Sequence, residues 1–136
     1  MTIIKTFYSI DKKERAYIHK REDGLFDVMS DSLEQDYYVD DDTNEVVNMK
    51  YFYWQENGVA SCITDDISIA EEDIKRDFQY EYIEAPMVDE FDIVLLKDGT
   101  KGMVTDITED GDYMIKPEGE KNKKLVSIME IIESYD

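Results

Sequence analysis

The side chains that most often carry chemistry are scarce in this sequence, apart from its carboxylates. The 136 residues contain one histidine, His19, and one cysteine, Cys62, and no serine or cysteine nucleophile motif accompanies the histidine. A single thiol forms no internal disulfide, and one thiol with one histidine cannot complete a zinc site. With 34 acidic residues, carboxylate pairs arise by chance and indicate no acid–base site. We predict that the protein is not an enzyme and binds no cofactor.

Two acidic segments have part of the spacing of a calcium-binding loop. Asp40, Asp42 and Asn44 stand at positions one, three and five, but position six, which needs a glycine, is Glu45. Residues 106–111 have a glycine at position six, but no glutamate follows at position twelve. We therefore predict no metal site, and we interpret both segments as solvated acidic loops.

The residues that best suit a functional site form an acidic, aromatic segment in the middle of the chain. Tyrosine and tryptophan offer a large contact area with a polar atom, and interfaces take their strongest contacts from such residues. Neighbouring carboxylates would meet lysine or arginine on a cationic partner. The predicted partner-binding residues are Tyr37, Tyr38, Asp40, Asp41, Asp42, Tyr51, Tyr53 and Trp54. The alternative for Tyr53 and Trp54 is that they are core side chains.

The net charge indicates which partners the surface would accept. Thirty-four acidic and 15 basic residues give a formal charge of -19, with -12 in residues 1–84 and -7 in residues 85–136. Such a field repels phosphate backbones and anionic lipid, and it speeds encounter with basic proteins. We expect a basic protein partner, and neither direct nucleic-acid binding nor membrane binding. Solubility alone is the alternative explanation of the acidity.

The first half of the chain alternates apolar and polar residues around turn-forming residues, which predicts a β-meander. The predicted strands lie near residues 4–10, 14–20 and 25–30. Asp23-Gly24 supplies a tight hairpin turn, because glycine accepts positive φ. Residues 33–50 lack periodicity, and we predict an exposed loop there. Residues 51–63 should be extended, with aromatic side chains on both faces.

Apolar residues at steps of three or four predict one amphipathic helix after this strand. The stripe consists of Ile67, Ala70, Ile74, Phe78 and Tyr82. Ser68 and Glu71 have the spacing of a capping box at the start of the helix. Pro86 would end the helix at the latest.

The last fifty residues alternate short apolar runs with turns, which is typical of a small barrel. Strands are predicted at residues 92–96, 102–107, 113–116 and 125–128, and a final turn or strand near 129–134. Asp98-Gly99 and Asp110-Gly111 have the composition of hairpin turns. The sequence therefore predicts an α+β fold of two units. Residues 1–84 form a meander with one helix and residues 85–136 a small β-barrel, with a shared core as an open alternative.

The segment from Phe91 to Gly119 resembles the SH3-like small barrels of bacterial proteins, including KOW and Tudor-like units. The likeness rests on Val94, Leu96, Asp98-Gly99, Gly102, Val104, Ile107, Gly111 and Tyr113. The resemblance implies an SH3-like barrel, whose ribosomal and transcription-factor versions bind RNA or protein. This copy lacks their basic character, so we expect a protein ligand.

The N-terminal part is similar to small Gram-positive proteins encoded beside polymorphic toxins and regarded as immunity proteins. In those proteins a β-meander, a tryptophan-containing strand and one helix recur. The residues that carry the likeness are Arg15, Tyr17, Ile18, Lys20, Arg21, Asp23-Gly24, Leu25, Phe26, Trp54, Ser61, Ile63 and the helix from Ala70. The resemblance implies a protein that blocks a toxin without chemistry of its own.

Charge and resemblance together predict a non-enzymatic binding protein that neutralises a cationic protein, most concretely an immunity protein against a bacterial toxin. Three alternatives stay open. One is a phage or mobile-element protein that mimics nucleic acid and inhibits a host DNA- or RNA-binding complex. Another is an adaptor in a larger assembly, and the third is an enzyme whose site the sequence does not reveal. The N-terminus has no apolar segment of signal-peptide length and no eighteen apolar residues run together, which predicts a cytoplasmic protein.

Overall fold

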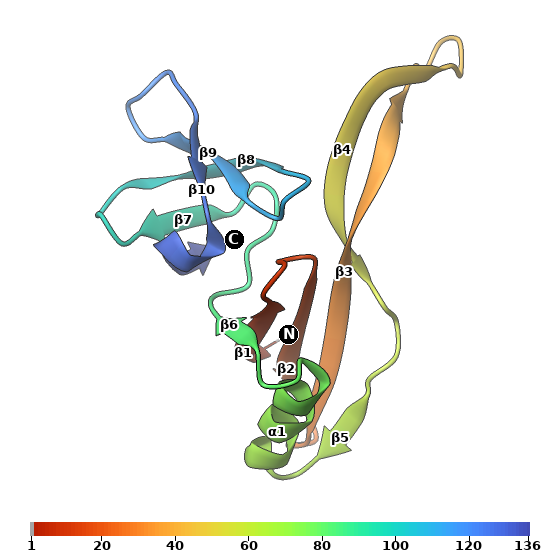
Figure 1. The fold of residues 1–136 in the computed structure, drawn as a ribbon, viewed down its shortest axis with the longest axis vertical. Helices are drawn as coiled ribbons and strands as arrows, with labels where there is room; N and C mark the ends of the chain where they lie inside the picture. The colour runs from red at the N-terminus through yellow and green to blue at the C-terminus, as the bar shows by residue number, and fades with distance from the viewer. Residues whose placement is uncertain (1) are drawn as a thin grey trace.

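The computed structural model describes residues 2–136 and shows two antiparallel sheets and one α-helix (Figure 1). The strands of the first sheet are β1 (Thr2–Ser9), β2 (Glu14–Lys20), β3 (Phe26–Val39), β4 (Val46–Glu56), β5 (Cys62–Thr64) and β6 (Tyr82–Glu84). Those of the second sheet are β7 (Ile93–Leu96), β8 (Lys101–Ile107), β9 (Tyr113–Pro117), β10 (Lys124–Val126) and β11 (Ile131–Tyr135). The helices are α1 (Ile67–Asp77) and the short 3₁₀-helix η1 (Ile128–Glu130).

The predicted α+β class, a meander with one helix followed by a small SH3-like barrel, is wrong. Strands hold 51% of the residues and helices 10%, so the protein is mainly β. The first sheet has the order β4-β3-β2-β1-β6, with β5 paired to β3, and the second has the order β10-β9-β8-β7-β11. The prediction failed because it treated residues 33–50 as loop, whereas most of that segment extends β3 and β4.

The base of the first sheet is covered on both faces. α1 packs on one face, where Ala70 and Ile74 share a buried cluster with Phe7 and Ile18. The second sheet packs on the other face, where Tyr8 joins its buried core. Successive side chains of a strand point to opposite faces, so Phe7 and Tyr8 contribute to different clusters. Full burial of each such apolar side chain stabilises the fold by about 1.5–3 kcal/mol.

The helix was predicted correctly as an amphipathic element, but its start differs. Asp66 is the N-cap, and its side chain accepts a hydrogen bond from the Ser68 N–H at 2.9 Å. Ser68 therefore lies in the first turn, and the predicted capping box does not form. Glu71 instead pairs with Lys5 of β1, with 2.8 Å between Oε1 and Nζ. The ion pair ties the helix to the strand beneath it.

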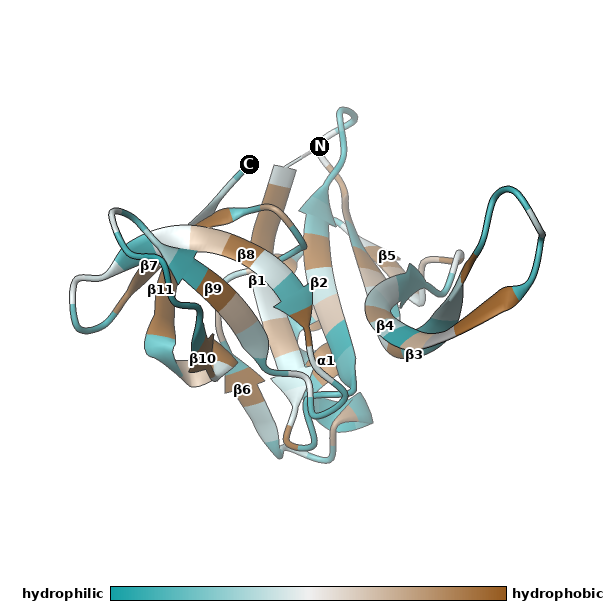
Figure 2. Cartoon of the chain, turned by 90° about the horizontal axis from the view of Figure 1, so that it is seen from above, coloured by the Kyte–Doolittle hydropathy of each residue, from teal (hydrophilic) through white to brown (hydrophobic). Residues whose placement is uncertain are grey.

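β3 and β4 continue past the body of the first sheet as a two-stranded arm, residues 34–53, which rises beside the second sheet in Figure 1 and whose tip points away from it in Figure 2. The predicted loop at residues 33–50 is wrong, because only residues 40–45 form the turn between the strands. Near the body, Tyr51, Phe52 and Tyr53 are half-buried, and Phe52 packs against the core of the second sheet. Residues 34–47 are exposed on both faces, so burial imposes no alternation on that part of the sequence. Tyrosine and valine nevertheless favour extended backbone.

The strands of the second sheet lie close to their predicted positions, and the two Asp-Gly turns are confirmed. Gly99 and Gly111 have φ angles of 90° and 77°, in the left-handed region that hairpin turns use. Gly102 is required by close packing, because a Cβ there would lie 2.5 Å from the Lys116 carbonyl oxygen. Its absence of a side chain lets β8 and β9 approach each other closely.

The two sheets divide near residue 85, yet a contiguous core joins them. Tyr8 and Val88 belong to the buried cluster of the second sheet, and Leu33 and Trp54 pack against it. The Tyr8 hydroxyl donates a hydrogen bond to the Pro86 carbonyl at 2.8 Å. The division into domains at residues 84 and 85 stays a prediction, and the shared cluster couples the two sheets physically.

Candidate functional site

One face of the arm gathers three tyrosines into a row, which we call the tyrosine ladder: Tyr38, Tyr51 and Tyr53. The ring centroids of Tyr38 and Tyr51 are 4.9 Å apart, and those of Tyr51 and Tyr53 are 5.8 Å apart. Cross-strand partners share a face, and Tyr51 is opposite Asp36 while Tyr53 is opposite Glu34. The register thus places two carboxylates beside the ladder.

The ladder combines aromatic faces, hydroxyl groups and negative charge. Tyr51 Oη and Asp36 Oδ2 are 3.5 Å apart. Partial desolvation raises the pKa of Tyr51, and the Asp36 carboxylate raises it further. The phenol therefore stays protonated at neutral pH and can donate a hydrogen bond. A lysine or arginine side chain finds both cation–π and ion-pair partners on such a face.

The tip of the arm carries the three consecutive aspartates. Asp40 has a structural role in the turn, because its Oδ1 accepts hydrogen bonds from the N–H groups of Asp42 and Thr43 at 2.8 and 3.3 Å. Among residues 2–136, the structure shows no hydrogen bond or ion pair to the carboxylates of Asp41 and Asp42. These two charges face solvent and are suited to long-range attraction of a cation.

Apolar side chains lie exposed just below the acidic tip. Val46 and Met49 are 67% and 60% exposed, and Val39 is half exposed. Figure 2 shows this hydrophobic stretch directly before the hydrophilic turn. No other element of the described residues packs on this part of the arm, so these apolar side chains stay largely exposed to solvent. A partner that bound here would bury them.

The other residues named from the sequence lie elsewhere. Tyr37 is on the opposite face of the arm from the ladder, where it is paired with Lys50. Trp54 lies at the base of the arm, and its ring packs against Tyr8, with 6.0 Å between centroids. The eight residues thus divide among the ladder, its reverse face, the tip and the core.

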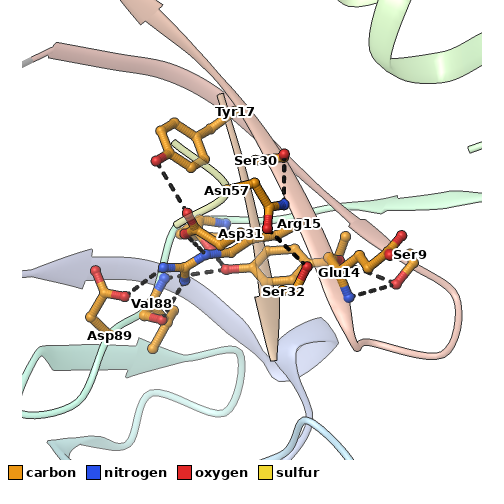
Figure 3. A network of polar contacts seen from close by, with 12 residues as sticks. Ser9, Glu14, Arg15, Tyr17, Ser30, Asp31, Ser32, Asn57, Val88 and Asp89 are labelled. Carbon is orange, nitrogen blue, oxygen red and sulfur yellow. Dashed lines mark hydrogen bonds and ion pairs between the residues drawn. The ribbon is translucent and has the colours of Figure 1, made fainter. Parts of the chain in front are cut away.

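Arg15 forms the main polar network at the base, between the two sheets (Figure 3). Its side chain is 2% exposed and its Nε donates to Asp31 Oδ2 at 2.7 Å. Nη1 and Nη2 donate to the Val88 carbonyl and to Asp89 Oδ1 at 2.8 and 2.6 Å. The guanidinium also lies 4.5 Å from the centre of the Trp54 ring. The network connects β2 and β3 to the segment that enters the second sheet.

The electrostatics of this network favour the charged form of Arg15. Burial alone would lower the pKa of Arg15, but the acidic groups around it, Tyr8, Asp89 and Asp31, raise that pKa above its usual value. All three hydrogen bonds go to groups within the chain itself. We therefore interpret Arg15 as a structural residue that fixes the base from which the arm projects.

Sequence reasoning missed Glu34, Asp36 and Arg15. The first two lay in the segment taken for a loop, and only the strand register shows that they share a face with the tyrosines. The burial of Arg15 was recognisable from the sequence, because Arg15 and Tyr17 alternate with Ala16 and Ile18 in β2. Bulky residues on both faces of a strand indicate a strand buried on both sides.

Other residues with chemical potential have structural contacts. His19 Nδ1 lies 3.2 Å from Asp27 Oδ1 on the neighbouring strand. Cys62 packs against the cluster under α1, and burial raises the pKa of its thiol. In the part of the chain that the structure describes, no three His, Cys, Asp or Glu side chains are placed to hold a metal ion. Within the same residues, no helix is both long and apolar enough to cross a membrane.

Comparison with known proteins returned no match: no family model, no curated protein and no solved structure is similar to this chain. The resemblance of the N-terminal part to immunity proteins therefore stays a prediction. The candidate site is therefore supported by the arrangement of residues in the arm alone.

Proposed function

We propose that this protein is a non-enzymatic, cytoplasmic binding protein that neutralises a cationic protein partner, most concretely as an immunity protein against a bacterial toxin. The observation that carries the proposal is the arm, residues 34–53. It is a two-stranded ribbon that displays a tyrosine ladder, exposed apolar side chains and an acidic tip.

The construction of the arm supports a binding role rather than a scaffold role. An isolated two-stranded ribbon is marginally stable in water, and folding alone gains little from extending it. Tyr38 and Tyr51 nonetheless offer rigid contact area, the type of residue that dominates interface energetics. The arm is tied to the body through Leu33 and Trp54, which pack into the core. A rigid base therefore presents a binding element.

The charge of the arm supports a cationic partner. The arm holds six carboxylates and one lysine, Lys50, which gives a net charge of -5. Asp41 and Asp42 at the tip would attract the partner at long range, and Glu34 and Asp36 would pair with it on contact. A basic catalytic cleft filled by this arm would be occluded without any chemistry.

The proposal is tested by capturing partners from cells of the native host with the wild-type protein and with a Tyr51→Ala, Tyr53→Ala variant. We expect a basic protein in a stoichiometric complex, measured by native mass spectrometry, and loss of that complex in the variant. Tyr80→Ala is the matched control, because Tyr80 is an exposed tyrosine outside the arm. Co-expression should then protect cells from the toxicity of the captured protein.

Two results would contradict the proposal. Retention of the same partner by both the wild type and the ladder variant would place the interface elsewhere. Competition with duplex DNA for several unrelated basic proteins would instead indicate a nucleic-acid mimic.

Charge removal at the tip gives a kinetic prediction. Replacing Asp40, Asp41 and Asp42 with asparagine should leave the melting temperature nearly unchanged, because asparagine can still accept the turn hydrogen bonds of Asp40. Association with the basic partner should slow by about tenfold at low salt, because surface charges act mainly on encounter. Stopped-flow association rates at several salt concentrations provide the measurement.

The matched control for this variant removes three exposed carboxylates from the second sheet. It replaces Glu118, Glu120 and Glu133 with glutamine and so has the same net charge. Equal rates for the two triple variants would show that overall charge, and not the arm, steers the encounter.

A further inference from the structure

β4 is the last strand on one side of the first sheet, and its outer edge is open. Among the described residues it pairs only with β3, because β5 joins β3 at Phe26–Val28 instead of continuing along β4. An open edge presents a row of unpaired N–H and C=O groups to any extended chain that approaches it. This feature is separate from the side-chain chemistry of the ladder.

The hydrogen bonds of β3 fix which groups of β4 point outward. Leu33 is opposite Trp54, yet its N–H donates to the Lys13 carbonyl on the other side of β3, at 2.8 Å. The Leu33–Trp54 pair is therefore not hydrogen-bonded across the ladder. Consistent with this alternation, the Asn57 N–H donates to the Ser30 carbonyl at 2.9 Å.

The alternation continues into the arm. Tyr53 and Tyr51 belong to the pairs that exchange hydrogen bonds with β3, so their N–H groups point inward. The N–H groups of Phe52 and Lys50, between and beyond them, point to the open edge. Along this stretch of β4, two N–H groups therefore point toward β3 and two point toward the open edge.

Among the described residues, β4 lacks three of the features that usually protect an open strand. Short length, prolines and several lysines are the common protections. β4 has 11 residues and no proline, and Lys50 is the one charged residue between Val46 and Trp54. The open stretch would match an added strand of about 30 Å.

Charge selects the occupant of this edge. A second copy of the chain would bring another arm of net charge -5 alongside the first, within a protein of net charge -19. Two such acidic arms would repel each other. A cationic strand has the opposite effect. On the ladder face its side chains would lie beside Tyr51 and Tyr53 of β4. A lysine or arginine is long enough to extend over these rings toward Glu34 and Asp36 on β3, about 10 Å from the added strand.

We propose that the outer edge of β4 receives an extended, cationic strand of the protein partner, which adds to the first sheet. The inference rests on the proposed function and specifies how the arm recognises its partner. Main-chain hydrogen bonds to the edge supply affinity, and the ladder with its carboxylates selects lysine or arginine at alternate positions.

The test uses the full chain and a nine-residue peptide that alternates arginine and valine, with both ends blocked. Its control is the same peptide with methylated backbone nitrogens through its central five residues, which keeps the charge and removes strand pairing. Calorimetry should give an affinity at least tenfold weaker for the methylated peptide. Hydrogen exchange of the complex should show new protection at Phe52 and Lys50, while Tyr51 and Tyr53 are protected with and without peptide.

A pair of variants tests the edge from the protein side. Lys50→Pro removes one outward N–H, and Lys50→Ala removes the same charge but keeps the N–H. We expect the proline variant to bind the unmodified peptide about fivefold more weakly than the alanine variant, from the loss of one hydrogen bond. Exchange protection at Tyr51 in both free variants verifies that the arm is folded.

Other outcomes would overturn the inference. Equal binding of both peptides without protection at Phe52 would show recognition by side chains alone, which leaves the proposed function standing. Binding of neither peptide at low salt would exclude a cationic strand as the occupant. A dimer of the free protein in sedimentation, with Phe52 protected, would identify a second copy as the occupant.

Discussion

Replacing Arg15 with methionine is expected to lower the free energy of unfolding by about 3–5 kcal/mol. The side chain is 2% exposed, and its loss leaves the buried carboxylate of Asp31 without its main partner. It also removes the donors to Val88 and Asp89, which connect the first sheet to the segment leading into the second. Urea unfolding followed by circular dichroism measures the change.

The fluorescence of Trp54 gives an independent readout of the same variant. Trp54 is the single tryptophan of the chain, and its ring lies 4.5 Å from the Arg15 guanidinium. A shift in its native-state emission would show that the arm's base has changed its packing. This readout separates a local rearrangement from a uniform loss of stability.

Two further variants control the Arg15 experiment. Arg76→Met removes a guanidinium that is 62% exposed and paired with Asp73, so it should change stability by less than about 0.5 kcal/mol. Arg15→Met combined with Asp31→Leu should recover part of the loss, because no unpaired buried charge remains. A loss below about 1 kcal/mol in the single variant would show that the network does not stabilise the fold.

The parts of the fold that the sequence predicted are those in which a local rule acts alone. Asp23-Gly24, Asp98-Gly99 and Asp110-Gly111 marked hairpins because few residues accept positive φ. The helix was visible because its apolar stripe faces a buried cluster. Hairpin turns that need glycine, and a helix that is buried on one face, can therefore be recognised from a single sequence.

The arm could not be predicted in this way, because alternation records a contrast between a buried and an exposed face. Residues 34–39, 46–47 and 49–50 have no strong contrast, since solvent reaches both faces of the ribbon there. Their strand structure depends on pairing across the turn, which is a non-local property. The role of this segment in binding stays a prediction, and the division of its residues into ladder, reverse face, tip and core required the register.

The arm and the Arg15 network contribute to binding in different ways, because the arm would contact a partner directly and the network would act through the order of the arm. The Arg15 network orders the base, and the ladder and open edge lie farther out on the paired strands β3 and β4. A rigid base reduces the ordering entropy that binding must overcome. Variants of the base should therefore weaken binding only as far as they disorder the arm, whereas ladder variants should weaken it directly.

Gly111→Ala is expected to destabilise the protein by about 3 kcal/mol, from two separate costs. The φ angle of Gly111 is 77°, which costs a residue with a Cβ about 1–2 kcal/mol. An added Cβ would also lie 2.5 Å from the Lys12 carbonyl oxygen and 2.7 Å from the Lys12 Cβ, and such overpacking costs about 1–3 kcal/mol. The β8–β9 turn therefore docks against the β1–β2 turn, where Lys12 Nζ also contacts Asp112 Oδ1 at 2.8 Å.

Gly99→Ala separates the two costs, because Gly99 has a φ of 90° with no atom within 4 Å of an added Cβ. This control should lose only the backbone contribution, about 1–2 kcal/mol, and thermal and urea unfolding of both variants measure the difference. If the two alanine variants lose the same stability, the contact between the turns contributes nothing. A larger loss for Gly111→Ala shows that the two sheets are held in a fixed relation where these turns meet.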